Sequence, residues 1–142
     1  MKTNSTLNAV LLFALLCVGG VAAARSTSMR EMARQPTAEI LAPLSVDAVR
    51  RAIVAGGATE EWKAVADQRG VVTLARNKGI DVVVVDVLYD AQGWQIVYKS
   101  SDGFDYERTD QGIEIHPDYN EWVAALDADI RRAIANAMTQ RR

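Results

Sequence analysis

Five valines within residues 82–87 constrain the fold more than any other feature of this sequence. Because β-branched side chains lose rotamer freedom in a helix and pack well on a pleated surface, this run predicts a strand over residues 80–89. Asn77-Lys78-Gly79 before it and residues 90–93 after it are short segments rich in the residue types that form tight turns. Short turns join antiparallel neighbours, so we expect an antiparallel meander.

Three further strands are expected to complete a four-stranded meander. Residues 61–68 and 71–76 precede the valine-rich strand, and residues 94–99 follow it with alternating apolar and polar side chains. Asp86 interrupts the valines, and a carboxylate at this place must face solvent or a basic partner, because burying it alone is costly. The candidate partners on neighbouring strands are Lys63, Arg76 and Lys99.

A short amphipathic helix is predicted before the meander. Ser45 is a suitable N-cap, because its hydroxyl can accept a hydrogen bond from an amide of the first turn. Val46, Val49 and Ile53 then recur at spacings of three and four. Gly56-Gly57 is expected to end the helix, since glycine adopts the left-handed conformation common at helix C-termini.

The last element is predicted to be a longer amphipathic helix. Asp118 is the expected cap, with Glu121 completing a capping box and Pro117 in front of it. The apolar stripe that follows comprises Tyr119, Trp122, Val123, Leu126, Ile130, Ala133, Ile134 and Ala137. The expected fold is therefore α+β with two layers: a four-stranded antiparallel meander covered on one face by two helices, in the order α-β-β-β-β-α.

The first residues have the layout of a secretory signal peptide. Lys2 supplies a positive charge, an apolar run of 15 residues spans 10–24, and Ala22-Ala23-Ala24 supplies small residues at its end. We predict a cleavable signal peptide over 1–24, a flexible leader over 25–44 and a single domain over 45–139. The alternative is a lipid anchor on Cys17, the only cysteine, although Leu16 is unsuitable for that cleavage site.

The charge balance argues against nucleic acid as a partner. Without Lys2 the chain has 15 Lys and Arg residues against 18 Asp and Glu residues, and the two signs are mixed along it. Phosphate-backbone binding requires a basic stripe, which is absent from the sequence. No cofactor or nucleotide motif is recognisable, so we predict no cofactor.

Two segments resemble a family of small bacterial periplasmic proteins and lipoproteins that are largely uncharacterised. The first is Trp94-Gln95-Ile96-Val97-Tyr98, which resembles a Tyr-x-Ile/Val-x-Tyr strand with Trp94 in the place of the first tyrosine and is followed by Ser100 and Ser101. The second is Ile115-His116-Pro117-Asp118-Tyr119-Asn120-Glu121-Trp122, which is similar to an Ile-His-x-x-Tyr-Asn-x-Trp helix start. The resemblance implies an envelope protein with no established activity, in a family whose members are often lipid-anchored.

The candidate binding residues are Tyr98, Ser101, His116 and Asn120, which we expect to converge if the domain binds a ligand. His116, the only histidine, is expected to make backbone hydrogen bonds before the last helix; its alternatives are ligand contact and proton transfer. No catalytic residue and no metal site is predicted. Four acidic residues lie within residues 102–110, but their spacing does not match a calcium loop, so a solvated acidic loop is expected.

The sequence therefore favours a non-enzymatic envelope domain that binds another protein, a wall polymer or a lipid surface. Membrane contact is expected only if Cys17 carries a lipid. Two alternatives remain open. One is a small periplasmic hydrolase that uses His116 with Ser100 or Ser101, although neither serine lies in a Gly-x-Ser-x-Gly turn. The other is an inhibitor of an exported hydrolase, with Phe104 and Tyr106 as its contact loop.

Overall fold

The computed structural model describes residues 26–37 and 44–140. The predicted signal peptide and Cys17 lie outside the described residues, as do 25 and 38–43 of the predicted leader. Two helices and eight strands follow in this order: β1 (Thr27–Ser28), β2 (Gln35–Pro36), α1 (Val46–Thr59), β3 (Lys63–Gln68), β4 (Val71–Lys78), β5 (Asp81–Tyr89), β6 (Gly93–Asp102), β7 (Glu107–Thr109), β8 (Gly112–Ile115) and α2 (Pro117–Thr139). Within the described ranges, no helix is both long enough and apolar enough to cross a membrane.

The strands form two antiparallel sheets. The larger has the order β2-β6-β5-β4-β3, and the smaller has the order β1-β8-β7. The predicted α+β class and the antiparallel run from β3 to β6 are confirmed. The four-stranded layout is not confirmed, because β2 adds a fifth strand at the β6 edge and β1, β8 and β7 form a second sheet. Asp86 finds the predicted basic partner in Lys99, whose Nζ lies 3.0 Å from Oδ2 of Asp86.

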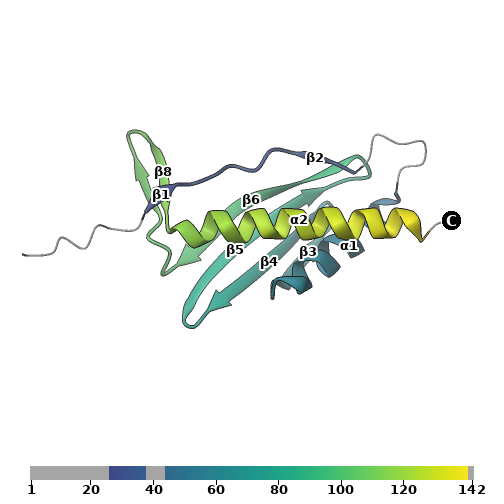
Figure 1. Cartoon of the computed structure of the whole chain (residues 1–142), viewed down its shortest axis with the longest axis horizontal. Helices are drawn as coiled ribbons and strands as arrows, with labels where there is room; N and C mark the ends of the chain where they lie inside the picture. The colour runs from purple at the N-terminus through teal and green to yellow at the C-terminus, as the bar shows by residue number, and fades with distance from the viewer. Residues whose placement is uncertain (1–25, 38–43, 141–142) are drawn as a thin grey trace, which may run out of the picture.

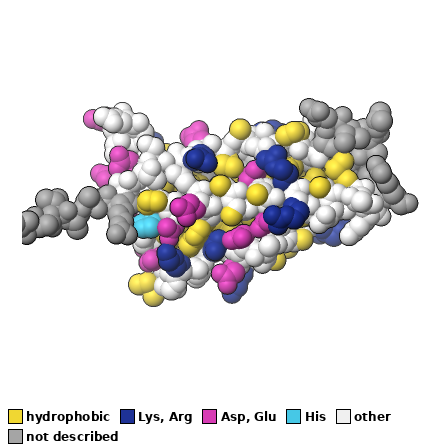
Figure 2. Space-filling model, in the orientation of Figure 1, with side chains coloured by type: hydrophobic (Ala, Val, Ile, Leu, Met, Phe, Trp, Pro, Cys, Tyr) yellow, Lys and Arg dark blue, Asp and Glu magenta, His cyan; other side chains and the backbone are white. Residues whose placement is uncertain are grey.

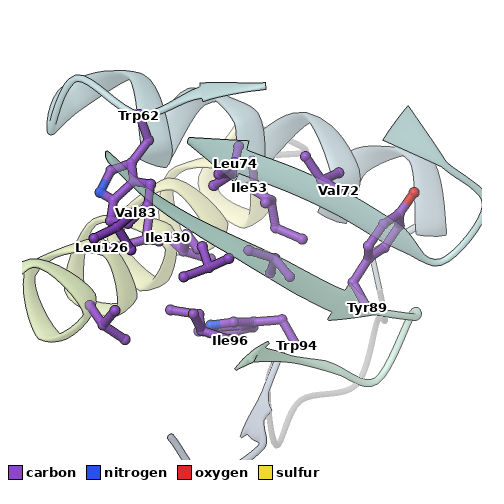
Figure 3. Close-up of a cluster of buried hydrophobic side chains, with 14 of the residues drawn as sticks. Ile53, Trp62, Val72, Leu74, Val83, Tyr89, Trp94, Ile96, Leu126 and Ile130 are labelled. Atoms are coloured by element: carbon purple, nitrogen blue, oxygen red, sulfur yellow. The ribbon is translucent and has the colours of Figure 1, made fainter. Parts of the chain in front are cut away.

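Both helices pack on one face of the larger sheet, with α2 running along it and α1 beside α2 (Figure 1). The core fills the space between the helices and this face, where Ile53 of α1 and Leu126 and Ile130 of α2 point towards the strands (Figure 3). Trp94 of β6 lies in the same layer and is fully buried. Burial of such side chains supplies the main stabilising free energy of the fold.

The glycine pair in α1 has a different role from the predicted one. The helix continues through Gly56 and Gly57 and ends at Thr59. A Cβ on Gly56 would lie 2.8 Å from Cα of Ile130. Gly56 therefore allows α1 and α2 to approach closely, which a pattern on one helix cannot reveal. The predicted cap is confirmed, since the Ser45 hydroxyl accepts a hydrogen bond from the amide of Ala48 at 3.1 Å.

Residues 26–37, which we call the strap, differ from the flexible leader predicted for 25–44. The strap runs along the β6 side of the molecule (Figure 1). At one end Thr27 and Ser28 pair with β8, and at the other Gln35 and Pro36 pair with β6. These short pairings join segments far apart in the sequence, so no local periodicity predicts them.

Candidate functional site

The start of α2 is organised by His116. Its Nδ1 accepts a hydrogen bond from the main-chain amide of Asp118 at 3.2 Å, which makes His116 the N-cap in place of the predicted Asp118. Its main-chain amide donates to the Phe104 carbonyl at 2.8 Å, as expected for a structural histidine. When Nδ1 accepts this hydrogen bond, the proton of the imidazole is on Nε2. The Lys78 ammonium, 2.6 Å from the Asp118 carboxylate, lowers the pKa of Asp118, and His116 adds to this effect.

In the first turn of α2, the side chain of Asn120 forms hydrogen bonds with the main chain of the strap. Its Oδ1 accepts from the amide of Arg30 at 2.7 Å, and its Nδ2 donates to the carbonyl of Ser28 at 2.9 Å. The side-chain amide thus pairs with the strap as a strand backbone would. This contact fixes the position of the strap relative to α2.

Of the four candidate binding residues, Tyr98 and Ser101 lie together. Tyr98 Oη and Ser101 Oγ are 3.0 Å apart, and an irregularity in the β5–β6 register lets both face the helices. The Tyr98 ring stacks on Tyr106 at 4.7 Å between centroids and meets Tyr119 edge-on at 5.7 Å. Burial raises the pKa of Tyr119 well above its usual value, and neighbouring Tyr98 adds to this, so its phenol stays protonated.

A pocket of about 360 Å³ opens between the strap and β6. Its size falls within the range of roughly 300–1,000 Å³ typical of small-molecule and cofactor sites. The lining combines aromatic and apolar side chains with polar ones in about equal measure, and joins the strap to β6, β7, β8 and α2. Its apolar members include Met29, Met32, Ile96, Tyr98, Tyr106, Ile113 and Tyr119.

The pocket also has a small excess of positive charge. Arg30 and Arg108 line it, against one acidic residue, Glu31. Among the described residues, neither arginine is in an ion pair, whereas Arg34 of the strap pairs with Asp90 at 2.6 Å. On the face that carries α2 and the strap, basic and acidic side chains alternate with apolar ones (Figure 2). Both arginines are exposed and could neutralise an acidic group at the pocket.

The four predicted binding residues do not converge on one point. Tyr98 belongs to the pocket, and Ser101 is hydrogen-bonded to its hydroxyl. Asn120 acts on the pocket through the strap, and the Nδ1 of His116 caps α2. The residues that sequence reasoning missed are Met29 and Met32, two apolar side chains in an otherwise polar segment. In the sequence, these two methionines are the feature that indicates packing of the strap against the rest of the domain.

Among the described residues, no hydrogen bond joins the His116 side chain to Ser100 or Ser101, the two serines considered as nucleophiles from the sequence. Ser101 Oγ is hydrogen-bonded to Tyr98 and not to His116. Phe104, proposed as part of an exposed inhibitory loop, is buried against His116 and Trp122. In the ranges that the structure describes, no group of three or more His, Cys, Asp and Glu side chains is placed to hold a metal ion.

Compared with models of protein families, with curated proteins and with solved structures, the chain matches none.

Proposed function

We propose that this chain is an exported, non-enzymatic binding module whose ligand occupies the pocket between the strap and β6. The observation that carries the proposal is the pocket itself, which combines tyrosine and methionine side chains with the polar side chains of Arg30, Gln95 and Arg108. Apolar surface in such a site provides affinity, and polar groups orient the bound molecule. The stacked pair of Tyr98 and Tyr106 offers a rigid aromatic surface, and Tyr106 is still 38% exposed.

Binding is favoured over hydrolysis because the hydrogen bonds of the candidate catalytic groups serve the fold. A serine hydrolase needs its base within hydrogen-bond reach of the nucleophile. Here the acceptor nitrogen of His116 is engaged by the Asp118 amide. Substituting His116 by alanine is therefore expected to destabilise the start of α2, by about 1 kcal/mol for loss of an N-cap.

The binding test uses anilinonaphthalene sulfonate, a fluorescent probe with aromatic rings and one anionic group. We expect saturable binding to the natively folded chain. Tyr106→Ala should weaken this binding, because it removes half of the stacked pair. Leu88→Ala is the matched control, since Leu88 is 37% exposed on β5 and does not line the pocket.

Both variants must unfold cooperatively, because partly unfolded proteins also bind this probe. Absence of saturable binding to the native chain, or equal loss in both variants, would contradict the proposed ligand site.

Export is the second part of the proposal, and it is supported by the sequence of residues 1–24 and by the family resemblance. The intact mass of the protein recovered from a bacterial envelope fraction tests it. A mass that begins at Arg25 supports a free exported domain. A mass that begins at Cys17 with acyl chains supports a lipid-anchored one, and an unprocessed chain in the cytoplasm contradicts export.

A further inference from the structure

The outer edge of β6 is open beside the pocket. The carbonyl of Gln92 faces the strap, because it accepts from the amide of Thr37 at 2.9 Å. Main-chain groups along a strand alternate between its two sides, so those of Trp94, Ile96 and Tyr98 face the same way. Trp94 pairs with Gln35, and among the described residues no strand pairs with this edge beyond it. Both Ile96 and Tyr98 line the pocket.

A side chain, not a main-chain ladder, joins the strap to β6 at the pocket. The Nε2 of Gln95 donates to the carbonyl of Met32 at 3.1 Å. The strap thus leaves β6 after its short pairing at Gln35 and returns to a sheet only at β8, where the amide of Met29 donates to the carbonyl of Ile113. Between these two attachments the pocket separates the strap from the edge of β6.

We propose that the ligand of this pocket is an extended peptide that adds to the edge of β6 as a strand, underneath the strap. The inference rests on the proposed binding function and specifies its ligand. The same edge already accepts an extended chain, since β2 pairs with the first residues of β6. The peptide continues that pairing, displaces the hydrogen bond between Gln95 and Met32, and offers main-chain groups to Ile96 and Tyr98.

The pocket also determines which peptides fit. Side chains of a strand alternate between its two faces, so every second peptide side chain points to the apolar wall of Met29, Met32 and Tyr119. Arg30 and Arg108 favour an acidic group, either a side chain or the terminal carboxylate. The expected ligand is an apolar segment with at least one acidic group.

The experiment uses heptapeptides selected from a phage-displayed random library on the purified chain, then resynthesised and measured by calorimetry. Each selected peptide is made in two N-methylated forms, with methyl groups on one or the other alternating set of amides. Strand addition predicts that the set facing β6 weakens binding by at least about tenfold, equivalent to roughly 1.4 kcal/mol. The other set should bind nearly as well as the parent, because its amides face away from β6.

Two variants of the chain test the charge preference. Arg108→Gln should weaken binding of peptides with an acidic group several-fold. Arg69→Gln is the matched control, because Arg69 is an exposed arginine outside this pocket and should leave binding unchanged.

Each outcome has a distinct meaning. If no selected peptide binds, or if both N-methylated forms bind alike, strand addition is wrong. Saturable binding of anilinonaphthalene sulfonate at Tyr106 would in that case leave the proposed pocket function intact and indicate a small amphipathic ligand. If neither the peptides nor the probe binds, both proposals fail. Amide-exchange protection of Ile96 and Tyr98 on peptide binding would support the inference directly.

Discussion

The two edges of the larger sheet are protected in different ways. At one edge, all six residues of β3 are exposed, and a bulge at Val65 interrupts its pairing with β4. Charged residues lie near both ends of this strand, with Lys63 at the start and Asp67 paired to Arg50 at 2.7 Å. Bulges and charges are common means by which proteins prevent a further strand from adding to an edge.

The β6 strand also carries a bulge, at Lys99, but its pairing with β5 is regular from Trp94 to Tyr98, the segment beside the pocket. The strand is 10 residues long, and the strap pairs with it only at Gln35 and Pro36. Beyond that point the strap lies away from the edge, and a pocket lined by both apolar and polar side chains separates the two. The β3 edge therefore disfavours a further strand, and the β6 edge is the one at which we propose that a peptide strand binds. Each prediction below tests a part of this contrast.

The largest effect on the free energy of unfolding is expected at Trp94. It is one of two tryptophans that lie near opposite edges of the larger sheet, and Trp62 is the other. Trp94 is fully buried on β6, and its Nε1 donates to Asp127 Oδ1 at 3.1 Å. Trp94→Phe leaves a cavity and removes a donor from a buried carboxylate, so the free energy of unfolding should fall by about 2–3 kcal/mol.

Trp62, next to β3, is the matched case. Its Nε1 is buried without a hydrogen-bond partner among the described residues. Trp62→Phe removes that unsatisfied donor, which offsets part of the lost packing, so we expect a cost of no more than about 1 kcal/mol. Urea unfolding with an unchanged m-value measures both. Equal costs would contradict the view that the β6 side depends on its buried polar contact.

An intermediate, local effect is expected from Asn120→Ala, which removes both side-chain hydrogen bonds to the strap. Two such bonds contribute about 1–2 kcal/mol together, equivalent to roughly a 5–30-fold change in an equilibrium constant. Exchange of the Met29 amide should accelerate by this factor, while the global unfolding free energy changes less. Asn136→Ala on the same helix is the control, since Asn136 lines the groove between α1 and α2. Equal acceleration in both variants would show that Asn120 does not hold the strap.

A smaller effect is expected when the pH is lowered, because acidification should weaken the attachment of the β2 end of the strap. The amide of Gln92, donating at 2.8 Å, and the guanidinium of Arg34 lower the pKa of Asp90. A carboxyl group whose pKa is depressed on folding stabilises the fold above its unfolded pKa of about 3.9, and this contribution is lost as pH falls through the folded value.

The measurement is amide exchange at Thr37 in the native chain and in Asp90→Asn. Exchange in the native chain should be slower at neutral pH, and the difference should disappear on acidification. A difference that persists at low pH would show that the charge of Asp90 does not hold this end of the strap.

The parts of the fold that follow from local pattern were predictable from the sequence. The valine run, the turns around it and the apolar stripe of the last helix each depend on residues close in the chain. The same holds for the Ser45 cap. The strap was not predictable, because it contacts the sheets through two-residue pairings with strands more than fifty residues away. Composition alone suggested a flexible leader.

The candidate binding site was less predictable than the fold, because most of its contacts join segments that are distant in the sequence. Tyr98 and Ser101 lie on one strand, and their proximity follows from a short sequence separation. The role of Asn120 depends on where the strap lies, and the role of Gly56 depends on the approach of a second helix. His116 and Asp118 are both capable caps, and only the backbone at residue 116 decides between them. The geometry of the candidate site therefore depends on contacts between segments that are distant in the sequence.

The smallest effect on stability, and the sharpest test of the contrast, comes from the same substitution at each edge. Val65→Thr and Val97→Thr change exposed side chains, with exposures of 60% and 38%, so each should alter the unfolding free energy by no more than about 0.5 kcal/mol. Val97 lines the pocket, so its threonine variant should weaken binding of the selected heptapeptides, whereas Val65→Thr should not. The reverse result would mean that the bulged β3 edge is the one that receives a strand.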